Sequence, residues 1–158
     1  KTGILQNNKA YSIFKDGTMV IWDIDNQEIV LKHKPNERFI TAIDIDTKNK
    51  LAYTTSRNGY LLIWQLDNGK IIKEIAHEGE VIHKLKIIDE ENLLSISRSG
   101  ILKLWSVSQE KCVFQKQLHN GRVVIADFNH NGRFLVSSDE SKMLMFWEIQ
   151  WDFLWEEL

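Results

Sequence analysis

The segment with the clearest potential for metal chemistry is the run Asp127–Gly132, which reads Asp-Phe-Asn-His-Asn-Gly. It has the alternating oxygen donors of the first half of a calcium-binding loop. The twelfth position of such a loop carries a bidentate Glu, but here it is Ser138, so a plain Asn-Gly turn is the better interpretation. His83 and His130 are isolated, and no His or Cys cluster has the spacing of a zinc site. The sequence therefore predicts no metal and no cofactor.

Catalytic motifs are also missing from the sequence. Ser, His and Asp residues are frequent, yet there is no nucleophile elbow, no phosphate-cradling glycine loop and no paired-carboxylate motif. We therefore expect these residues to be structural hydroxyls and turn formers, and the protein not to be an enzyme.

Binding chemistry is indicated by charged residues that recur seven positions before four tryptophans. The tryptophans are Trp22, Trp64, Trp105 and Trp147, and the charged residues are Lys15, Arg57, Arg98 and Glu140. Three cations in one register could bind carboxylates or phosphates, because Arg presents a fixed fork of donors. Solvated turn residues are the alternative interpretation, since charged turns are common. The neighbouring candidates are Glu37, Arg38, Glu78, Glu80, Asn120 and Arg122.

The four tryptophans are separated by 42, 41 and 42 residues, which makes the chain an internal repeat. Each ends a short run such as Tyr60–Trp64, and most of these runs are apolar on both faces, which indicates a strand buried between neighbouring sheets. Six residues before each tryptophan begins a turn signal, at Asp16-Gly17, Asn58-Gly59, Ser99-Gly100 and, without glycine, Ser141-Lys142. Asp-Gly and Asn-Gly predict hairpins of type I′. Repeats of this length with several strands each are typical of β-propeller blades.

A hydroxyl lies ten residues before each tryptophan, and a His lies 28 residues before each of the last two. These residues are Ser12, Thr54, Ser95, Ser137, His77 and His119, with Asn36 at the His position before Trp64. In this register the chain resembles the WD-repeat β-propeller family. In that family a His from the loop between blades, a Ser or Thr on the second strand, an acidic residue in the following turn and the Trp form a hydrogen-bonded brace.

The resemblance implies one brace in each repeat, with several positions substituted. The brace residues it implies are Ser12, Asp16 and Trp22; Asn36, Thr54, Asn58 and Trp64; His77, Ser95 and Trp105; and His119, Ser137 and Trp147. Ser99 and Ser141 stand at the acidic positions of the last two repeats, and only Asp16 keeps the acid. Only Asp23 keeps the Asp of the Trp-Asp pair that names the family.

The resemblance and the repeat register together predict an all-β fold, a β-propeller of WD-repeat type with about three and a half four-stranded blades. We expect one domain over 1–158, with blades at about 1–34, 35–76, 77–118 and 119–150 and a tail at 151–158. Strands are predicted at about 39–46, 51–56, 60–66, 70–76, 81–88, 92–97, 101–107, 111–117, 122–128, 133–138 and 142–149. The first repeat is expected to start within a blade, with Lys1–Leu5 as the remnant of an innermost strand. Because blades cannot bury both faces alone, we expect the C-terminal part of a larger propeller.

Composition excludes several classes of partner. The chain is 43% hydrophobic and 27% charged, and its net charge of −2 gives no basic field for nucleic acid. A single cysteine, Cys112, excludes an intrachain disulfide and favours an intracellular, cytoplasmic location. No apolar stretch approaches the ~20 residues that span a bilayer, so we expect no membrane partner.

The predicted function is a non-catalytic protein–protein interaction or scaffold module that binds a protein or peptide on the propeller rim. By resemblance, this rim consists of the turns between second and third strands and the loops between blades, which is where Arg57 and Arg98 would lie. The missing blades of its own propeller are the other expected partner. Two alternatives stay open: a sensor propeller that regulates an attached enzyme or nucleotide-dependent switch, and an architectural subunit of a large assembly. The sequence upstream of residue 1 would separate them.

Overall fold

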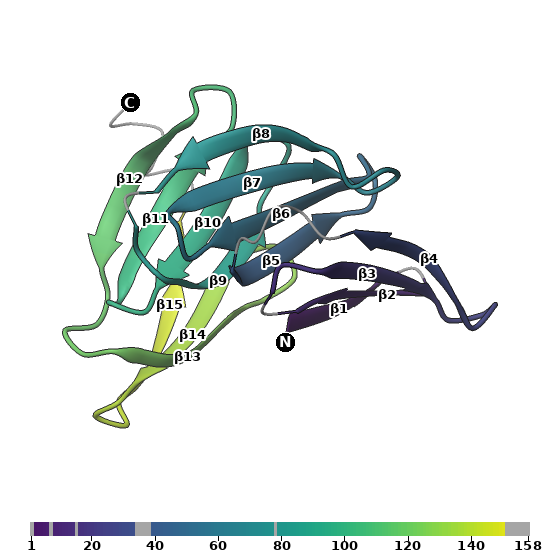
Figure 1. Cartoon of the computed structure of the whole chain (residues 1–158). Coiled ribbons are helices and arrows are strands. Elements are labelled where there is room, and N and C mark those ends of the chain that lie inside the picture. The colour runs from purple at the N-terminus through teal and green to yellow at the C-terminus, as the bar shows by residue number, and fades with distance from the viewer. Residues whose placement is uncertain (1, 7, 15, 34–38, 78, 151–158) are drawn as a thin grey trace. The chain divides into compact units, whose positions relative to one another are not determined.

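The protein is an all-β chain, described here from a computed structural model. The structure describes residues 2–6, 8–14, 16–33, 39–77 and 79–150, which form four antiparallel sheets (Figure 1). The chain divides into two compact units, Lys1–Gly79 and Glu80–Leu158, and each unit is described by itself. Each unit contains two sheets, which we call blades one to four in chain order. None of the described residues belongs to a helix that could cross a membrane.

Blades one and two make up the first unit, and each is an antiparallel meander with its strands in chain order. The strands are β1 (Thr2–Gln6), β2 (Lys9–Ile13), β3 (Met19–Asp23), β4 (Glu28–His33), β5 (Ile40–Asp46), β6 (Leu51–Ser56), β7 (Tyr60–Gln65) and β8 (Ile71–Ala76). Met19 and Ile21 of β3 pack with Leu62 and Trp64 of β7 in one buried cluster. Strand β7 is buried without a break from Leu61 to Trp64, which explains why its sequence does not alternate between apolar and polar residues.

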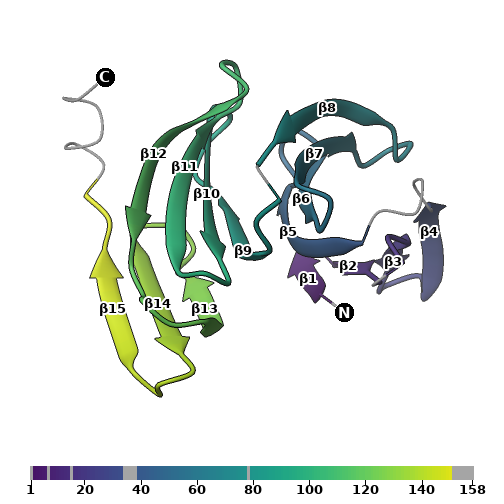
Figure 2. The ribbon, with the colours of Figure 1, turned by 60° about the vertical axis from the view of Figure 1, so that its left-hand side comes forward.

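Blades three and four make up the second unit. Their strands are β9 (Ile82–Ile87), β10 (Asn92–Ser97), β11 (Ile101–Ser106), β12 (Lys111–Gln117), β13 (Val123–Phe128), β14 (Phe134–Asp139) and β15 (Leu144–Glu148). Leu102 and Leu104 of β11 pack with Leu135 of β14 and Trp147 of β15. The two sheets of this unit therefore lie face to face, as Figure 2 shows for β9–β12 and β13–β15.

The predicted strands agree with the structure to within two residues at every boundary, and the all-β fold is confirmed. One correction concerns the first repeat. Strand β1 pairs with β2 from Thr2 to Gln6, so blade one is a complete four-stranded sheet and does not start within a blade. In the described part of the chain, only blade four has three strands. Whether the two units close into one domain stays a prediction.

Candidate functional site

The turns between second and third strands carry most of the predicted binding residues. In three of them the N–H of the fourth turn residue donates to the carbonyl of the first: Gly59 to Ser56 (3.1 Å), Gly100 to Ser97 (3.1 Å) and Lys142 to Asp139 (3.0 Å). These fourth residues have φ of 87°, 84° and 66°, whereas the residues before them do not have positive φ. The turns are therefore type I turns followed by one left-handed residue, and the predicted type I′ geometry is wrong. Lys142 takes the glycine position in blade four, so this hairpin forms without glycine.

The second residue of each of these turns has a fixed backbone and an exposed side chain. Its N–H donates to a carbonyl next to the first strand of the same blade: Arg57 to Phe39 (2.7 Å), Arg98 to Val81 (2.8 Å) and Glu140 to Arg122 (2.9 Å). The side chains of Arg57, Arg98 and Glu140 all lie in solvent. A partner that bound them would order little backbone, because the backbone is already held.

Arg98 and Arg122 come close together in the second unit. The carbonyl of Arg98 accepts a hydrogen bond from the N–H of Val123 (2.8 Å), which fixes the segment carrying Arg122 against the turn carrying Arg98. The pKa of the half-buried His83 is lowered, first by burial and then by the charges of Arg98, Lys84 and Arg122. We call His83, Lys84, Arg98 and Arg122 the basic cluster.

The arginines of the basic cluster are available to a ligand. Lys84 forms an ion pair with Asp127, with 2.8 Å between Nζ and Oδ1. Among residues 79–150, by contrast, no carboxylate forms an ion pair with Arg98 or Arg122, and both side chains are exposed. Sequence reasoning missed His83 and Lys84. They lie just after the start of a predicted strand that begins beside the Arg98 turn, and that position was the signal that could have found them.

The other predicted rim residues have different outcomes. Lys15, Asn36, Glu37, Arg38 and Glu78 lie outside the described residues. Arg57 belongs to the first unit, so its joint action with Arg98 stays a prediction. Glu80 is half-buried, and its Oε1 lies 3.3 Å from the buried Nζ of Lys103. Glu80 therefore serves the fold, while Asn120 remains exposed.

The brace of blade four contains the residues that the resemblance implied. Ser137 Oγ lies 2.6 Å from His119 Nε2 and accepts a hydrogen bond from Trp147 Nε1 at 3.2 Å. The acid differs from the one expected at Ser141. His119 Nδ1 lies 3.1 Å from Oδ2 of Asp139, and Ser141 itself donates to Oδ1 of Asp139 (2.5 Å). The acidic residue of this brace therefore lies two positions earlier in the chain than the register of the family suggests.

The carboxylate of Asp139 forms hydrogen bonds with the turn as well as with His119. Its pKa is lowered, chiefly by the hydrogen bond from the Ser141 hydroxyl, against the opposing effect of burial, with a further contribution from His119. The N–H groups of Ser141 (3.0 Å) and Met143 (3.4 Å) also reach its Oδ1. The carboxylate is thus held ionised by several donors.

The other repeats retain parts of this brace. Trp64 Nε1 donates to Thr54 Oγ1 (2.7 Å), and Trp105 Nε1 donates to Ser95 Oγ (2.8 Å). In blade one, Trp22 and Ser12 are both described and no hydrogen bond joins them. His77 Nε2 lies 3.1 Å from the carbonyl oxygen of Ser56, and a contact with Ser95 in the second unit stays a prediction.

Two acidic-position residues of the implied braces have local roles. Asp16 accepts hydrogen bonds from the N–H (3.0 Å) and the hydroxyl (2.9 Å) of Thr18, so it closes its own turn. Asn58 is exposed in the equivalent turn of blade two.

The calcium-loop lookalike is a hairpin turn between β13 and β14. Oδ1 of Asn129 accepts from the N–H of Phe134 (2.9 Å), and Oδ1 of Asn131 accepts from the N–H of Arg133 (3.0 Å). Gly132 has a φ of 71° and completes the turn. Among the described residues, no group of three His, Cys, Asp or Glu side chains is placed to hold a metal ion.

Sheets of three or four antiparallel strands, packed face to face and joined by turns in register, define a repeat protein of propeller type. Residues 110–148, which extend from just before β12 to the end of β15, match the family model "WD domain, G-beta repeat". This segment is a WD40 repeat, and the resemblance drawn from the sequence is confirmed. WD40 domains are generally protein-interaction scaffolds and typically non-catalytic.

Crystal structures of two computationally designed proteins are similar to this chain. The match to Ika4 has a TM-score of 0.72 and 18% identity and covers 94% of this chain and 89% of that chain. The match to Ika8 has a TM-score of 0.70 and 18% identity and covers 93% of this chain and 45% of that chain. At this identity the likeness concerns the fold alone. No curated protein matches the sequence.

Proposed function

We propose that this protein is a non-catalytic interaction module that binds an acidic segment of a protein partner at the basic cluster of its second unit. The observation that carries the proposal is the pair Arg98 and Arg122, two exposed cations held side by side. Their backbones are tied by hydrogen bonds from Arg98 to Val81 and from Val123 to Arg98. Because the backbones that carry them are held in place, the two guanidinium groups can bind carboxylates or phosphates of an extended segment.

Electrostatics supports a preference for anions at this place. The net charge of the chain is −2, so attraction must come from a local group of cations rather than from the protein as a whole. The pKa of His83 is lowered first by burial and then by the charges of Arg98, Lys84 and Arg122, and an anionic ligand would relieve the second of these effects. Glu140, whose N–H is bonded to the Arg122 carbonyl, borders the cations and would favour a segment with one basic residue beside its acids.

The test is fluorescence anisotropy of the complete chain with a labelled glutamate-rich peptide and with its phosphoserine-containing counterpart. Arg98→Glu and Arg122→Glu should each weaken binding about tenfold or more, because a hydrogen bond to a charged group contributes about 1.5–3 kcal/mol. The affinity should also fall as salt is added, since the contacts are exposed.

The matched control is Lys111→Glu, which makes the same change of charge on the exposed residue at the start of β12. Lys111→Glu should change the affinity for the peptide only slightly, by the small effect of the changed net charge. Equal weakening by Lys111→Glu and Arg98→Glu would show that only net charge matters and would refute a site at the basic cluster. Arg57→Glu, made in parallel, tests whether the equivalent turn of blade two takes part.

A further inference from the structure

His83 lies at an irregular point of the first strand of blade three. In the register of β9 and β10, Lys84 pairs with Ile96 and Ile82 pairs with Ser97, so the residue between them is the extra residue of a β-bulge. A bulge bends its strand and re-aims the side chain that it carries, and bulges are frequent next to functional sites. His83 is half-buried, and its ring forms no hydrogen bond with another described residue. The ring therefore has a donor to offer to a ligand.

The same bulge recurs in blades two and four with side chains of different chemistry. The residues at the equivalent place are Thr41 in blade two and Val124 in blade four. The hydroxyl of Thr41 donates to the carbonyl of Thr55 at 3.2 Å and so is bonded within its own sheet. Of these three bulges, the one in blade three carries a side chain that can change its charge near neutral pH.

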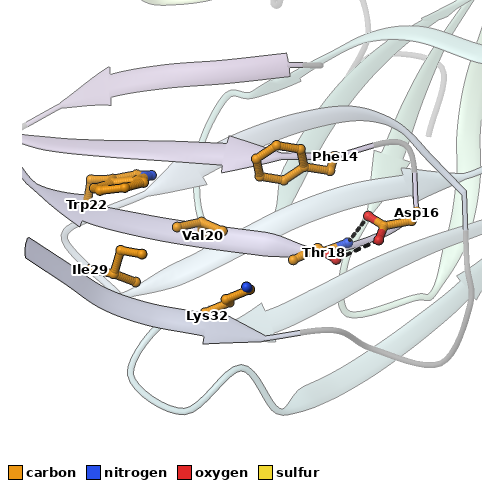
Figure 3. Close-up of a pocket in the computed structure, with 7 residues that line it drawn as sticks. All are labelled: Phe14, Asp16, Thr18, Val20, Trp22, Ile29 and Lys32. Carbon is orange, nitrogen blue, oxygen red and sulfur yellow. Dashed lines mark hydrogen bonds between the residues drawn. The ribbon is translucent and has the colours of Figure 1, made fainter.

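The turns between second and third strands also differ in charge. Blade three carries Arg98, whereas the equivalent residue of blade four is Glu140. In the corresponding turn of blade one, Asp16 accepts hydrogen bonds from the N–H and the hydroxyl of Thr18, as the dashed lines in Figure 3 show. A carboxylate in the turn repels an anion. Arg57 of blade two is a cation, but its blade has no titratable residue at the bulge, so blade three combines the two features.

Three segments of the second unit bring the donors of the basic cluster together. The N–H of Arg98 donates to the carbonyl of Val81 (2.8 Å), two residues before His83. The carbonyl of Arg98 accepts from the N–H of Val123 (2.8 Å), the residue after Arg122. The start of β9, the Arg98 turn and the start of β13 are therefore held to one another by backbone hydrogen bonds.

The charges that act on His83 are positive. Its pKa is lowered first by burial and then by the charges of Arg98, Lys84 and Arg122. The acids of the adjoining segments are bound to other groups or lie in solvent: Asp127 pairs with Lys84, Glu80 with Lys103 and Asp139 with His119, while Glu140 is exposed. An anion at the basic cluster therefore meets two guanidinium groups that no described carboxylate neutralises.

We propose that the basic cluster binds a phosphorylated serine or threonine of a protein partner, with His83 as a third donor beside Arg98 and Arg122. This inference rests on the proposed function and names its ligand. A phosphate monoester carries a charge of about −1.5 to −2 near pH 7 and three acceptor oxygens, which matches two guanidinium groups and one imidazole. A single carboxylate has one charge and two oxygens, so it matches this set of donors less well.

The open position of the site favours a phosphate carried on a protein segment. Arg98 and Arg122 have their side chains in solvent, and WD40 domains are generally protein-interaction scaffolds. Binding would also be coupled to a proton. A phosphate beside His83 opposes the three cations and favours the charged imidazole, so His83 should take up a proton when the ligand binds.

The test compares the wild-type chain with His83→Gln by fluorescence anisotropy of the labelled phosphoserine peptide and its glutamate counterpart. The wild type should bind the phosphopeptide about tenfold more tightly, the gain from one additional hydrogen bond to a charged group. The titration runs from about pH 8 to pH 5.5, a range that spans the ordinary histidine pKa. Over this range the ratio of wild-type to His83→Gln affinity for the phosphopeptide should rise about fivefold or more, because the charged imidazole donates a stronger hydrogen bond than the neutral ring. Protonation of the phosphate affects both proteins alike and cancels in the ratio.

His130→Gln is the matched control, because it removes an exposed histidine from the turn after β13, at the other end of that strand from Arg122. It should bind the phosphopeptide as the wild type does at every pH. Equal affinities of the wild type for the two peptides, or a His83→Gln ratio that does not change with pH, would overturn the inference. The proposed function would still stand in either case if Arg98→Glu weakened both peptides, and would itself fail if Arg98→Glu weakened neither.

NMR of the His83 ring in the wild-type chain is a second readout that needs no variant. The pKa of His83 should rise when the phosphopeptide is saturating, and an unchanged pKa would overturn the inference. Inorganic phosphate serves as the competitor in the anisotropy assay. If it displaced the peptide at a concentration equal to that of the unlabelled phosphopeptide, the protein segment would add nothing and the assignment to a phosphorylated protein would be wrong.

Discussion

Replacing Ser137 by Ala isolates the hydrogen bonds at the centre of the blade-four brace. Ser137 is fully buried, and its Oγ is within hydrogen-bond distance of His119 Nε2 (2.6 Å) and Trp147 Nε1 (3.2 Å). The substitution removes one oxygen atom and leaves the backbone and the apolar packing of β14 in place. Its effect on stability therefore reports the hydrogen bonds and not a cavity.

The magnitude follows from the burial of the two groups left without Ser137. A buried polar group that loses its partner costs about 1–3 kcal/mol. His119 is also buried, so its nitrogen should lie toward the upper end of that range, whereas the half-buried Trp147 can recover part of its loss through water. We expect Ser137→Ala to lower the free energy of unfolding by about 2–4 kcal/mol in total. Ser95→Ala leaves Trp105 Nε1 without its hydroxyl acceptor and should cost about 1–2 kcal/mol.

The assay is guanidinium denaturation of the complete chain, with amide hydrogen exchange of β14 and β15 to assign the loss to blade four. Ser138→Ala is the matched control, because this neighbouring hydroxyl makes one weak bond of 3.5 Å to the carbonyl of Asp139. Its effect should stay within about 0.5 kcal/mol. If Ser137→Ala and Ser138→Ala shift the midpoint equally, the brace does not stabilise the blade and the reasoning is refuted.

Two further predictions concern a turn and a titrating group. Gly100→Ala should destabilise the chain more than Gly79→Ala: both glycines have positive φ, which costs an alanine about 1–2 kcal/mol, but only at Gly100 would the new Cβ overlap the His119 carbonyl. Thermal melts of the two variants measure this, and equal losses would contradict the overlap. The pKa of His83, followed by NMR, should lie below the ordinary histidine value and rise in Arg98→Gln, because one repelling charge is removed. Because His83 binds a proton more readily in the unfolded chain than in the folded chain, stability should fall as the pH drops below about 6.5. The fall should be smaller in Arg98→Gln. An unchanged His83 pKa in this variant would place Arg98 away from His83.

The features that the sequence predicts well are those that each repeat specifies locally. A tryptophan is the second-to-last residue of the third strand of each blade and a turn precedes that strand, so the register of the strands follows from spacing alone. Lys142 shows that the turn does not depend on glycine, since a lysine takes the left-handed position at φ 66°. The predicted boundaries hold for this reason, even where the turn signal is weak.

The features that the sequence predicts poorly depend on which segments meet in space. Ser141 stands at the family's acidic position, but Asp139 reaches His119 from two residues earlier. The sequence places Glu80 among the candidate rim residues, but its carboxylate is paired with the buried Lys103. His83 and Lys84 join the basic cluster because β9 begins beside the Arg98 turn, a proximity that follows from the order of the strands in the sheet and not from the spacing of charges before the tryptophans.

In blade four the brace and the rim turn are parts of one hydrogen-bonded structure. Oδ2 of Asp139 bonds to His119, while Oδ1 accepts from the N–H groups of Ser141 and Met143, so one carboxylate ties the loop between blades to the turn that carries Glu140. The N–H of Glu140 then reaches the carbonyl of Arg122 and fixes the basic cluster at its edge. Backbone atoms and buried groups make all of these bonds, and the side chains of Arg122 and Glu140 take no part in them. Rim side chains can therefore vary to suit a partner while their positions stay fixed, which is what a scaffold for recognition requires.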